Sequence, residues 1–405
     1  MATAAALPAP RHPLLNPWFR KWWMGSTVSI AGDQFYLVAL PWVVLQLTSS
    51  GLAMGTVLMT AAIPRALLML LGGAITDRTS PRKVLMATAG TRAAAVALIG
   101  LLLWTLHIRL WHLYVLGFAF GVADAFAMPA ASAFLPSLVE SEQLPEANSV
   151  AQSTALLAGI LGPTPAGFLI KAKGVAWAFV LDAISFLFII GALIGLPDPS
   201  KRAGGRKPSL LKSVAEGLGF VRQDVALRTL MAVAAVINFC TIGPFSVGLA
   251  YLAKHRFASP SAYGLCISSV AAGALAGMML AGVARSKRRG KLLLGGTTLL
   301  GMGMTAIGFL QPLWSIAVLL LAMGAISGYV NVQLQSWIQQ RVEVAVRGRV
   351  MSVLMLAAFG LMPISLATAG ILVGWSVAGM FALAGLAVVA MSAIGALQRP
   401  VREIE

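Results

Sequence analysis

The chain has 405 residues, of which 59% are hydrophobic and only 11% are charged. Soluble domains carry about 25% charged residues, so this composition excludes a soluble globular protein. The net charge is +17, but the 30 lysines and arginines are spread over many short loops and form no single basic face, which argues against nucleic-acid binding. Cys240 and Cys266 lie in apolar runs, so we expect no disulfide framework and no cysteine metal site.

Apolar runs bounded by charges, proline or glycine follow one another along the chain. A helix that crosses the hydrocarbon core needs about 20 apolar residues, and twelve runs reach roughly this length. The predicted spans are 23–47, 53–75, 84–106, 111–135, 147–170, 175–196, 227–252, 261–284, 291–310, 313–338, 348–373 and 377–397. No run alternates as a strand does, so the pattern predicts an all-α membrane protein with twelve transmembrane helices.

The loops between these runs differ in charge. Most of the 30 lysines and arginines fall on the side that holds both termini. The opposite loops hold only Arg109, Lys171, Lys173, Lys254 and Arg256. Because positive charge stays on the cytoplasmic side of a membrane, both termini are predicted to be cytoplasmic.

One long polar segment divides the spans into six and six. The predicted units are a cytoplasmic arm at 1–22, a first six-helix bundle at 23–196, a cytoplasmic linker at 197–226, a second bundle at 227–397 and a cytoplasmic tail at 398–405. Apolar residues at helical spacing in the linker predict an amphipathic helix on the inner membrane surface; they are Leu211, Val214, Leu218, Val221 and Val225. Gly55 and Gly73 recur at one spacing as Gly264 and Gly282, which suggests two parallel repeats with a substrate path between them.

A loop signature follows the second predicted span. Its residues are Gly73, Asp77, Arg78, Arg82 and Lys83. The pattern resembles the signature of the major facilitator superfamily between its second and third helices. A carboxylate there can act as a conformational latch, because it can cap the positive N-terminus of the helix that begins near residue 348. The alternative is a tight turn that only orients the span by its charge.

The fifth span contains closely spaced glycines and a proline. Gly159, Gly162, Pro163 and Gly167 resemble the Gly-Pro motif of exporting members of the superfamily. Proline breaks one backbone hydrogen bond and glycine allows close approach, so we expect a hinge, with ordinary small-residue packing as the alternative. The stretches at 32–42, 124–136 and 347–352 narrow the resemblance to the branch of the enterobactin exporter and the macrolide efflux pumps, over residues 18–397.

Ionisable residues within the spans are costly in the membrane and are therefore candidates for function. They are Asp33, Arg65, Arg92, Asp124 and Asp182. At 1.5 Å per residue, Asp33, Arg65 and Asp124 fall near the midplane, Arg92 nearer the cytoplasm and Asp182 nearer the outside, within reach of interfacial water. The resemblance implies that the first and fourth spans line the cavity. Asp33 and Asp124 are thus proton-coupling candidates, and Arg65 can neutralise one of them. Asp33 is the first choice: Arg65 is expected beside it, and rocking of the halves is expected to separate this pair so that Asp33 takes up a proton. The alternative is a permanent ion pair that holds helices together.

Uncharged polar and soft side chains supply the candidates for substrate contact. They are Tyr36, Met128, Asn238, Tyr329, Gln333 and Ser336. Those of the tenth span form one stripe, which either lines the cavity or joins helices by hydrogen bonds.

Enzyme motifs are not apparent, because the phosphate-loop and dinucleotide patterns are incomplete around 290 and 301. The sequence predicts a secondary active transporter and not an enzyme. It is expected to be a proton-coupled exporter, an antiporter of small amphipathic compounds such as drugs or siderophores, that works by alternating access in a bacterial inner (plasma) membrane. The expected partners are a small-molecule substrate, protons and membrane lipid, without nucleic acid, ATP, metal or cofactor. A lipid flippase, a solute importer, or a membrane scaffold or sensor that does not transport are the alternatives.

Overall fold

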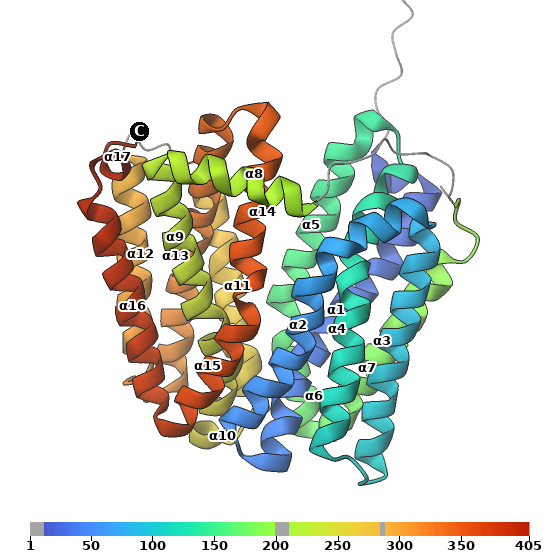
Figure 1. The fold of residues 1–405 in the computed structure, drawn as a ribbon. Coiled ribbons are helices and arrows are strands. Elements are labelled where there is room, and N and C mark those ends of the chain that lie inside the picture. Colours follow the sequence, from blue (N-terminus) through green and yellow to red (C-terminus); the bar gives the residue numbers. More distant parts are fainter. Residues whose placement is uncertain (1–11, 199–209, 284–287, 405) are drawn as a thin grey trace, which may run out of the picture.

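The computed structural model describes residues 12–198, 210–283 and 288–404, and in these residues all regular structure is helical (Figure 1). One group of helices forms the first half of the molecule. Its helices are α1 Pro17–Thr48, α2 Gly51–Arg78, α3 Pro81–Trp104, α4 Leu110–Phe134, α5 Leu144–Leu161, α6 Pro163–Lys173 and α7 Val175–Leu193, with short 3-10 turns at Pro13–Leu15, Leu135–Ser137 and Ser141–Gln143.

The second half follows a helix, α8 Leu210–Gln223, that crosses one end of the molecule (Figure 1). Its helices are α9 Val225–Gly243, a π-helical turn Pro244–Gly248, α10 Leu249–Phe257, α11 Pro260–Val283, α12 Arg289–Ile307, α13 Leu313–Arg341, α14 Val344–Gly360, α15 Met362–Trp375, α16 Val377–Leu397 and α17 Arg399–Arg402.

Side-chain caps set several helix starts. Asn16 Oδ1 accepts the backbone N–H of Trp18 at 2.9 Å, and Pro17 occupies the first helical position, where its missing N–H costs nothing. The helix α1 therefore begins six residues before the predicted start of the first span, inside the predicted arm. Residues 1–11 of that arm and 199–209 of the predicted linker lie outside the described residues.

Nine helices of the described residues are long and apolar enough to cross a membrane, or ten if the bent pair α5 and α6 counts as one span. The predicted ranges without such a helix are 291–310 and 348–373. The helix in the first, α12, carries Arg289 and Lys291 in its first turn, and the second range is divided between the shorter α14 and α15. The structure therefore supports nine or ten spans, and twelve stays a prediction.

Prolines mark the breaks inside three predicted spans. Pro163, Pro244 and Pro363 each stand within two residues of a break, where a proline removes a backbone donor. Between α5 and α6 the chain turns by 41°.

The two halves touch at the end of the molecule away from the C-terminus, through α2 against α15 and α6 against α11 (Figure 1). Glycines allow this approach: a Cβ on Gly264 of α11 would lie 2.1 Å from the carbonyl oxygen of Pro163, and one on Gly55 would lie 2.5 Å from that of Leu366. Toward the C-terminal end the two groups of helices diverge (Figure 1).

The helix α8 is fastened to the second half. Arg349 Nε of α14 lies 3.0 Å from Glu216 Oε2 of α8, and just after α8 the N-cap of α9 is held in the same region, with Arg341 Nε 2.6 Å from Asp224 Oδ2. Partial burial acts to raise the pKa of Asp224, but hydrogen bonds from Arg341 and from the backbone N–H groups at the start of α9 outweigh it, so this pKa is lowered. Val221 of α8 is buried in the apolar cluster at this end of the second half.

Candidate functional site

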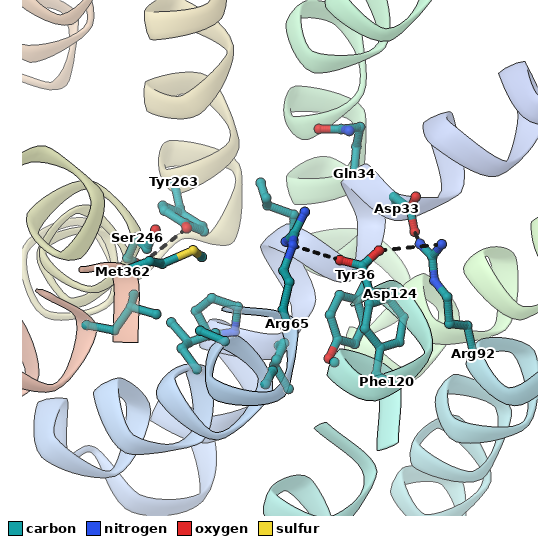
Figure 2. A pocket seen from close by; sticks show the side chains of 18 residues that line it. Asp33, Gln34, Tyr36, Arg65, Arg92, Phe120, Asp124, Ser246, Tyr263 and Met362 are labelled. Atoms are coloured by element: carbon teal, nitrogen blue, oxygen red, sulfur yellow. Dashed lines mark hydrogen bonds and ion pairs between the residues drawn. The ribbon is translucent and has the colours of Figure 1, made fainter. Parts of the chain in front are cut away.

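A cavity of about 290 Å³ lies between the two halves (Figure 2). The first half supplies all of its charged lining residues, and the second half supplies uncharged ones. The polar residues from the first half are Asp33, Gln34, Tyr36, Arg65, Arg92 and Asp124, and the second half contributes Ser246, Tyr263, Met362 and Leu366. The cavity therefore has a charged wall and a largely apolar wall.

The four charges form one chain of ion pairs. Arg65 Nε lies 3.0 Å from Asp124 Oδ2, and Arg92 Nη1 lies 3.7 Å from Asp124 Oδ1. Arg92 Nη2 donates to Asp33 Oδ1, so that Arg92 connects the two carboxylates (Figure 2). Because each carboxylate has its own arginine, these four groups together are electrically neutral.

The pairing of Asp33 differs from the prediction. The sequence pointed to Arg65 as the arginine beside Asp33 and placed Arg92 nearer the cytoplasm; in the structure Arg92 pairs with Asp33 and Arg65 with Asp124. The depth of a Cα at 1.5 Å per residue does not give the depth of an arginine head, because the side chain is long and reaches along the helix. Arg92 is thus the site residue that helix arithmetic missed, although its position inside a span was itself a signal.

Aromatic rings hold Arg92 in place. Its guanidinium carbon lies 4.8 Å from the ring centroid of Phe120 and 4.4 Å from that of Phe186. Tyr36 in turn stacks on Phe120, with 4.2 Å between the two ring centroids. Arg92 is only 9% exposed, and in such a desolvated setting cation–π contacts contribute about 2 kcal/mol or more.

Asp182 lies deeper than predicted. Its position suggested contact with interfacial water, whereas the structure buries it completely, at 0% exposure. Ser185 Oγ lies 3.3 Å from Asp182 Oδ1, and Asp182 Oδ2 has no hydrogen-bond partner in the structure. Gly32 of α1 packs so closely here that a Cβ would lie 2.0 Å from Ser185 Oγ. The close approach of α1 and α7 at Gly32 explains this complete burial.

Of the predicted substrate contacts, Tyr36 lines this cavity. Met128, Asn238, Tyr329, Gln333 and Ser336 do not belong to its lining. Met128 is 46% exposed, and the side chain of Asn238 donates to the carbonyl oxygen of Ala234 on its own helix. On α13, Gln333 is buried, while Tyr329 and Ser336 are half-buried.

The predicted latch is described only in part. The side chains of Gly73, Asp77 and Arg78 lie outside the described residues. Arg82 donates to the carbonyl oxygens of Leu193 at 2.8 Å and Leu196 at 2.9 Å. The backbone N–H of Lys83 donates to Ser80 Oγ at 3.3 Å, in the cap of α3. The two hydrogen bonds of Arg82 join the start of α3 to the end of α7 within one half.

The predicted hinge residues coincide with the bend between α5 and α6. Gly162 precedes the break, and a Cβ there would lie 2.5 Å from Gln34 Cγ. A Cβ on Gly167 would lie 2.5 Å from the carbonyl oxygen of Pro260, in the other half. Gly159 faces open space. The motif therefore provides both a bend, at Gly162 and Pro163, and a tight contact between halves, at Gly167.

Apolar helices in two groups, with a cavity between them that has charged side chains on one wall, define a multi-pass membrane transporter. The chain belongs to the transmembrane secretion effector family of the major facilitator superfamily, whose sequence profile matches residues 9–405. This confirms the resemblance found in the sequence. Members of this superfamily are transporters, so the protein is a transporter and not an enzyme.

The chain is similar in sequence to two proteins that are named as efflux proteins. The chain is 30% identical to the multidrug efflux pump Tap of Mycolicibacterium fortuitum over 358 residues, which cover 84% of this chain and 85% of that protein. It is 22% identical to macrolide efflux protein A of Streptococcus pyogenes over 302 residues, or 73% of this chain and 74% of that protein.

Two solved structures share the fold. A bacterial homologue of the iron transporter ferroportin, in an inward-facing state, has a TM-score of 0.68 at 17% identity and covers 93% of this chain and 98% of its own. A variant of the nucleoside transporter NupG has a TM-score of 0.70 at 12% identity, with 94% and 98% covered.

Proposed function

We propose that this protein is a proton-coupled exporter of small amphipathic compounds, an antiporter of drug-like or siderophore-like molecules in a bacterial inner membrane. The names of the relatives support drug efflux, because both are described as efflux proteins. The observation that carries the proposal is the cavity between the halves, with carboxylates on one wall and aromatic and apolar side chains around it. An amphipathic molecule needs both kinds of contact.

The contacts between halves support alternating access. With both termini in the cytoplasm, as the loop charges predict, the end at which α2 meets α15 and α6 meets α11 faces outward. The structure then corresponds to an inward-facing state, closed outside and ready to take a substrate from the cytoplasm. Movement of one half against the other around the cavity would expose the same site to the outside.

The position of the ion pairs limits how transport can be coupled to protons. Asp33, Arg65, Arg92 and Asp124 all belong to α1–α4 of the first half. A rigid rocking of the halves leaves these partners together, so coupling through separation of a pair by that motion does not fit the structure. We infer instead that substrate and proton act through the charge balance of this wall, because Arg92 already contacts both Asp33 and Asp124 and can change its balance between them.

Transport by the purified protein in liposomes tests this function. A labelled macrolide or tetraphenylphosphonium should accumulate against its gradient when a pH gradient is imposed. Asp33→Asn or Asp124→Asn should abolish uphill accumulation, while downhill exchange survives, because an amide has nearly the same volume and still forms hydrogen bonds. Uphill transport by one variant assigns coupling to the other acid, and uphill transport by both refutes coupling through these acids.

The same liposomes separate the alternatives. Transport of labelled lipid alone indicates a flippase, and accumulation in the opposite direction indicates an importer. Binding without any turnover indicates a scaffold or sensor.

A further inference from the structure

Within the predicted spans of the first half, the three carboxylates Asp33, Asp124 and Asp182 outnumber the two arginines Arg65 and Arg92 by one. Arg92 pairs with Asp33 and Arg65 with Asp124, whereas Asp182 forms no ion pair among the described residues. Its side chain is completely buried, and its nearest polar contact is Ser185 on the same helix. An ionised carboxylate in this position would be buried without a partner, which costs several kcal/mol even where the membrane adapts.

Three buried polar atoms around this position have no hydrogen-bond partner. They are Asp182 Oδ2, Tyr36 Oη and Arg92 Nε. Tyr36 packs against Phe179, and Arg92 packs against Phe186. These two rings stand about one helical turn before and one turn after Asp182 on α7, so both side chains lie near Asp182 and act on it electrostatically. Two of the atoms are donors and one is an acceptor. A proton on Asp182 removes the unpaired charge of the acceptor, and buried water can accept from the two donors.

The surroundings of Asp182 leave few groups that can change its charge. The helix α7 packs against α1, α3 and α6. Asp33 and Tyr36 face it from α1, and Arg92 faces it from α3. The lysines of α6, Lys171 and Lys173, are exposed at the far end of that helix. The protonation of Asp182 is therefore governed first by its burial and then by the charges of Asp33 and Arg92.

We propose that Asp182 holds the exchanged proton, and that the cavity takes up an amphipathic organic cation when this proton leaves. The proposal rests on the exporter function inferred above. With Asp182 protonated, the two remaining carboxylates and the two arginines sum to zero charge. Loss of the proton leaves one negative charge, which a singly charged cation restores to zero.

The geometry provides a route for this exchange. The O–H bond of Asp182 breaks and its proton passes to water in the cavity, past Tyr36 and Asp33. Arg92, whose Nε is unpartnered, then turns from Asp33 to the new carboxylate. Asp33 lines the cavity and Asp182 does not, so the negative charge is transferred to the wall that faces the substrate. Reprotonation of Asp182 from the opposite side returns Arg92 to Asp33 and releases the cation.

Infrared difference spectra test the first part directly. At neutral pH the purified wild-type protein should show the carbonyl stretch of a protonated carboxyl group that does not exchange readily with bulk water. Asp182→Asn should remove this band, and Asp33→Asn should retain it. Asp224→Asn is the matched control, because it removes an acid at the surface and should leave the band unchanged. A band that persists in Asp182→Asn, or is missing from the wild type, overturns the proposal.

Binding of tetraphenylphosphonium tests the exchange. This cation has no titratable group, so any proton that appears must come from the protein. The wild type should release about one proton for each bound cation, and its affinity should rise about tenfold per pH unit over the range in which Asp182 holds its proton. Asp182→Asn should release none and should bind with an affinity that does not depend on pH. Proton release by Asp182→Asn, or no release by the wild type, contradicts the exchange.

The outcomes distinguish this proposal from the proposed function. Uphill transport driven by a pH gradient in Asp182→Asn liposomes refutes the role of Asp182 and leaves the exporter intact. A wild-type protein that shows the infrared band and releases the proton, but never transports against a gradient, refutes the exporter and retains the proton site.

Discussion

Replacing Gly264 with alanine should shift the transporter away from the state seen here. A Cβ on Gly264 would lie 2.1 Å from the carbonyl oxygen and 2.8 Å from the carbonyl carbon of Pro163, which belongs to the other half. Both atoms are backbone, so no rotamer change can make room. The methyl group therefore forces α6 and α11 apart, and this strain exists only while the halves touch at that end.

The size of the effect follows from the cost of overpacking. An extra methyl group in a tight contact costs about 1–3 kcal/mol. Because this cost falls on one of two states, the population ratio should change by about 5- to 150-fold in favour of the state in which this end is open. In Gly264→Ala, the state in which the halves touch at this end would then become a minor species, unless in the wild type it is more stable than the open state by a similar free energy.

Distances between spin labels measure this shift. Trp111 at the start of α4 and Trp314 at the start of α13 are exposed at the end where the halves touch, and Leu15 and Leu397 are exposed at the other end. In Gly264→Ala the first distance should lengthen and the second should shorten. The native cysteines are both buried and would be replaced before labelling.

Gly273 offers a control on the same helix. A Cβ there would lie 1.9 Å from the carbonyl oxygen of Leu321, within the second half. Gly273→Ala should thus lower thermal stability without changing either distance, because α11 and α13 stay together in both states. If Gly264→Ala behaves in the same way, with unchanged distances and only lower stability, the reasoning is refuted.

Three further substitutions have defined outcomes. Asp77→Asn should destabilise, by about 0.3–1 kcal/mol, the state in which the halves close at the end that holds the chain termini, because the carboxylate no longer interacts with a helix N-terminus. Spin-label distances across that end should then lengthen. Unchanged distances would mean that Asp77 only orients the span by its charge. Pro163→Ala should fold normally and transport more slowly, because the restored backbone bond stiffens the bend; normal turnover or failure to fold would contradict a hinge. Asp224→Asn should lower the melting temperature at neutral pH. The lowered pKa of Asp224 means that its contribution is present above its ordinary value of 3.8 and is lost as the pH falls through the lowered value, so the two proteins should converge in acid.

Ten of the twelve predicted spans coincide with described helices that are long and apolar enough to cross a membrane, if the bent pair α5 and α6 counts as one, because apolar length decides where a chain can cross. The sequence also located the charged residues of the cavity, since a charge within a span is costly wherever it points. The breaks were harder to foresee. Pro163 coincides with a break, whereas Pro41 and Pro64 lie inside continuous helices. Whether a helix continues past a proline depends on what else satisfies the freed carbonyl, and that is set by neighbouring helices.

Partners within the site could not be assigned from the sequence for a related reason. Arg65 and Arg92 both have side chains long enough to reach either acid, and contacts with aromatic rings determine which acid Arg92 pairs with. Phe120 and Phe186 confine Arg92 beside Asp33, and these rings come from α4 and α7, far apart in the chain. Similarly, the position of Asp182 in its span predicts contact with interfacial water, whereas α1 covers this side chain at Gly32.

The unequal walls of the cavity bear on how such a protein can change over evolution. Every charge that lines it belongs to α1–α4, while the second half presents Ser246, Tyr263, Met362 and Leu366. Mutations on the uncharged wall can reshape the space offered to a compound without disturbing the charged groups to which we assign proton coupling. On the exporter function proposed above, a chimera that keeps this first half and takes its second half from a relative should therefore acquire the donor's spectrum of compounds and keep the pH dependence set by the first half.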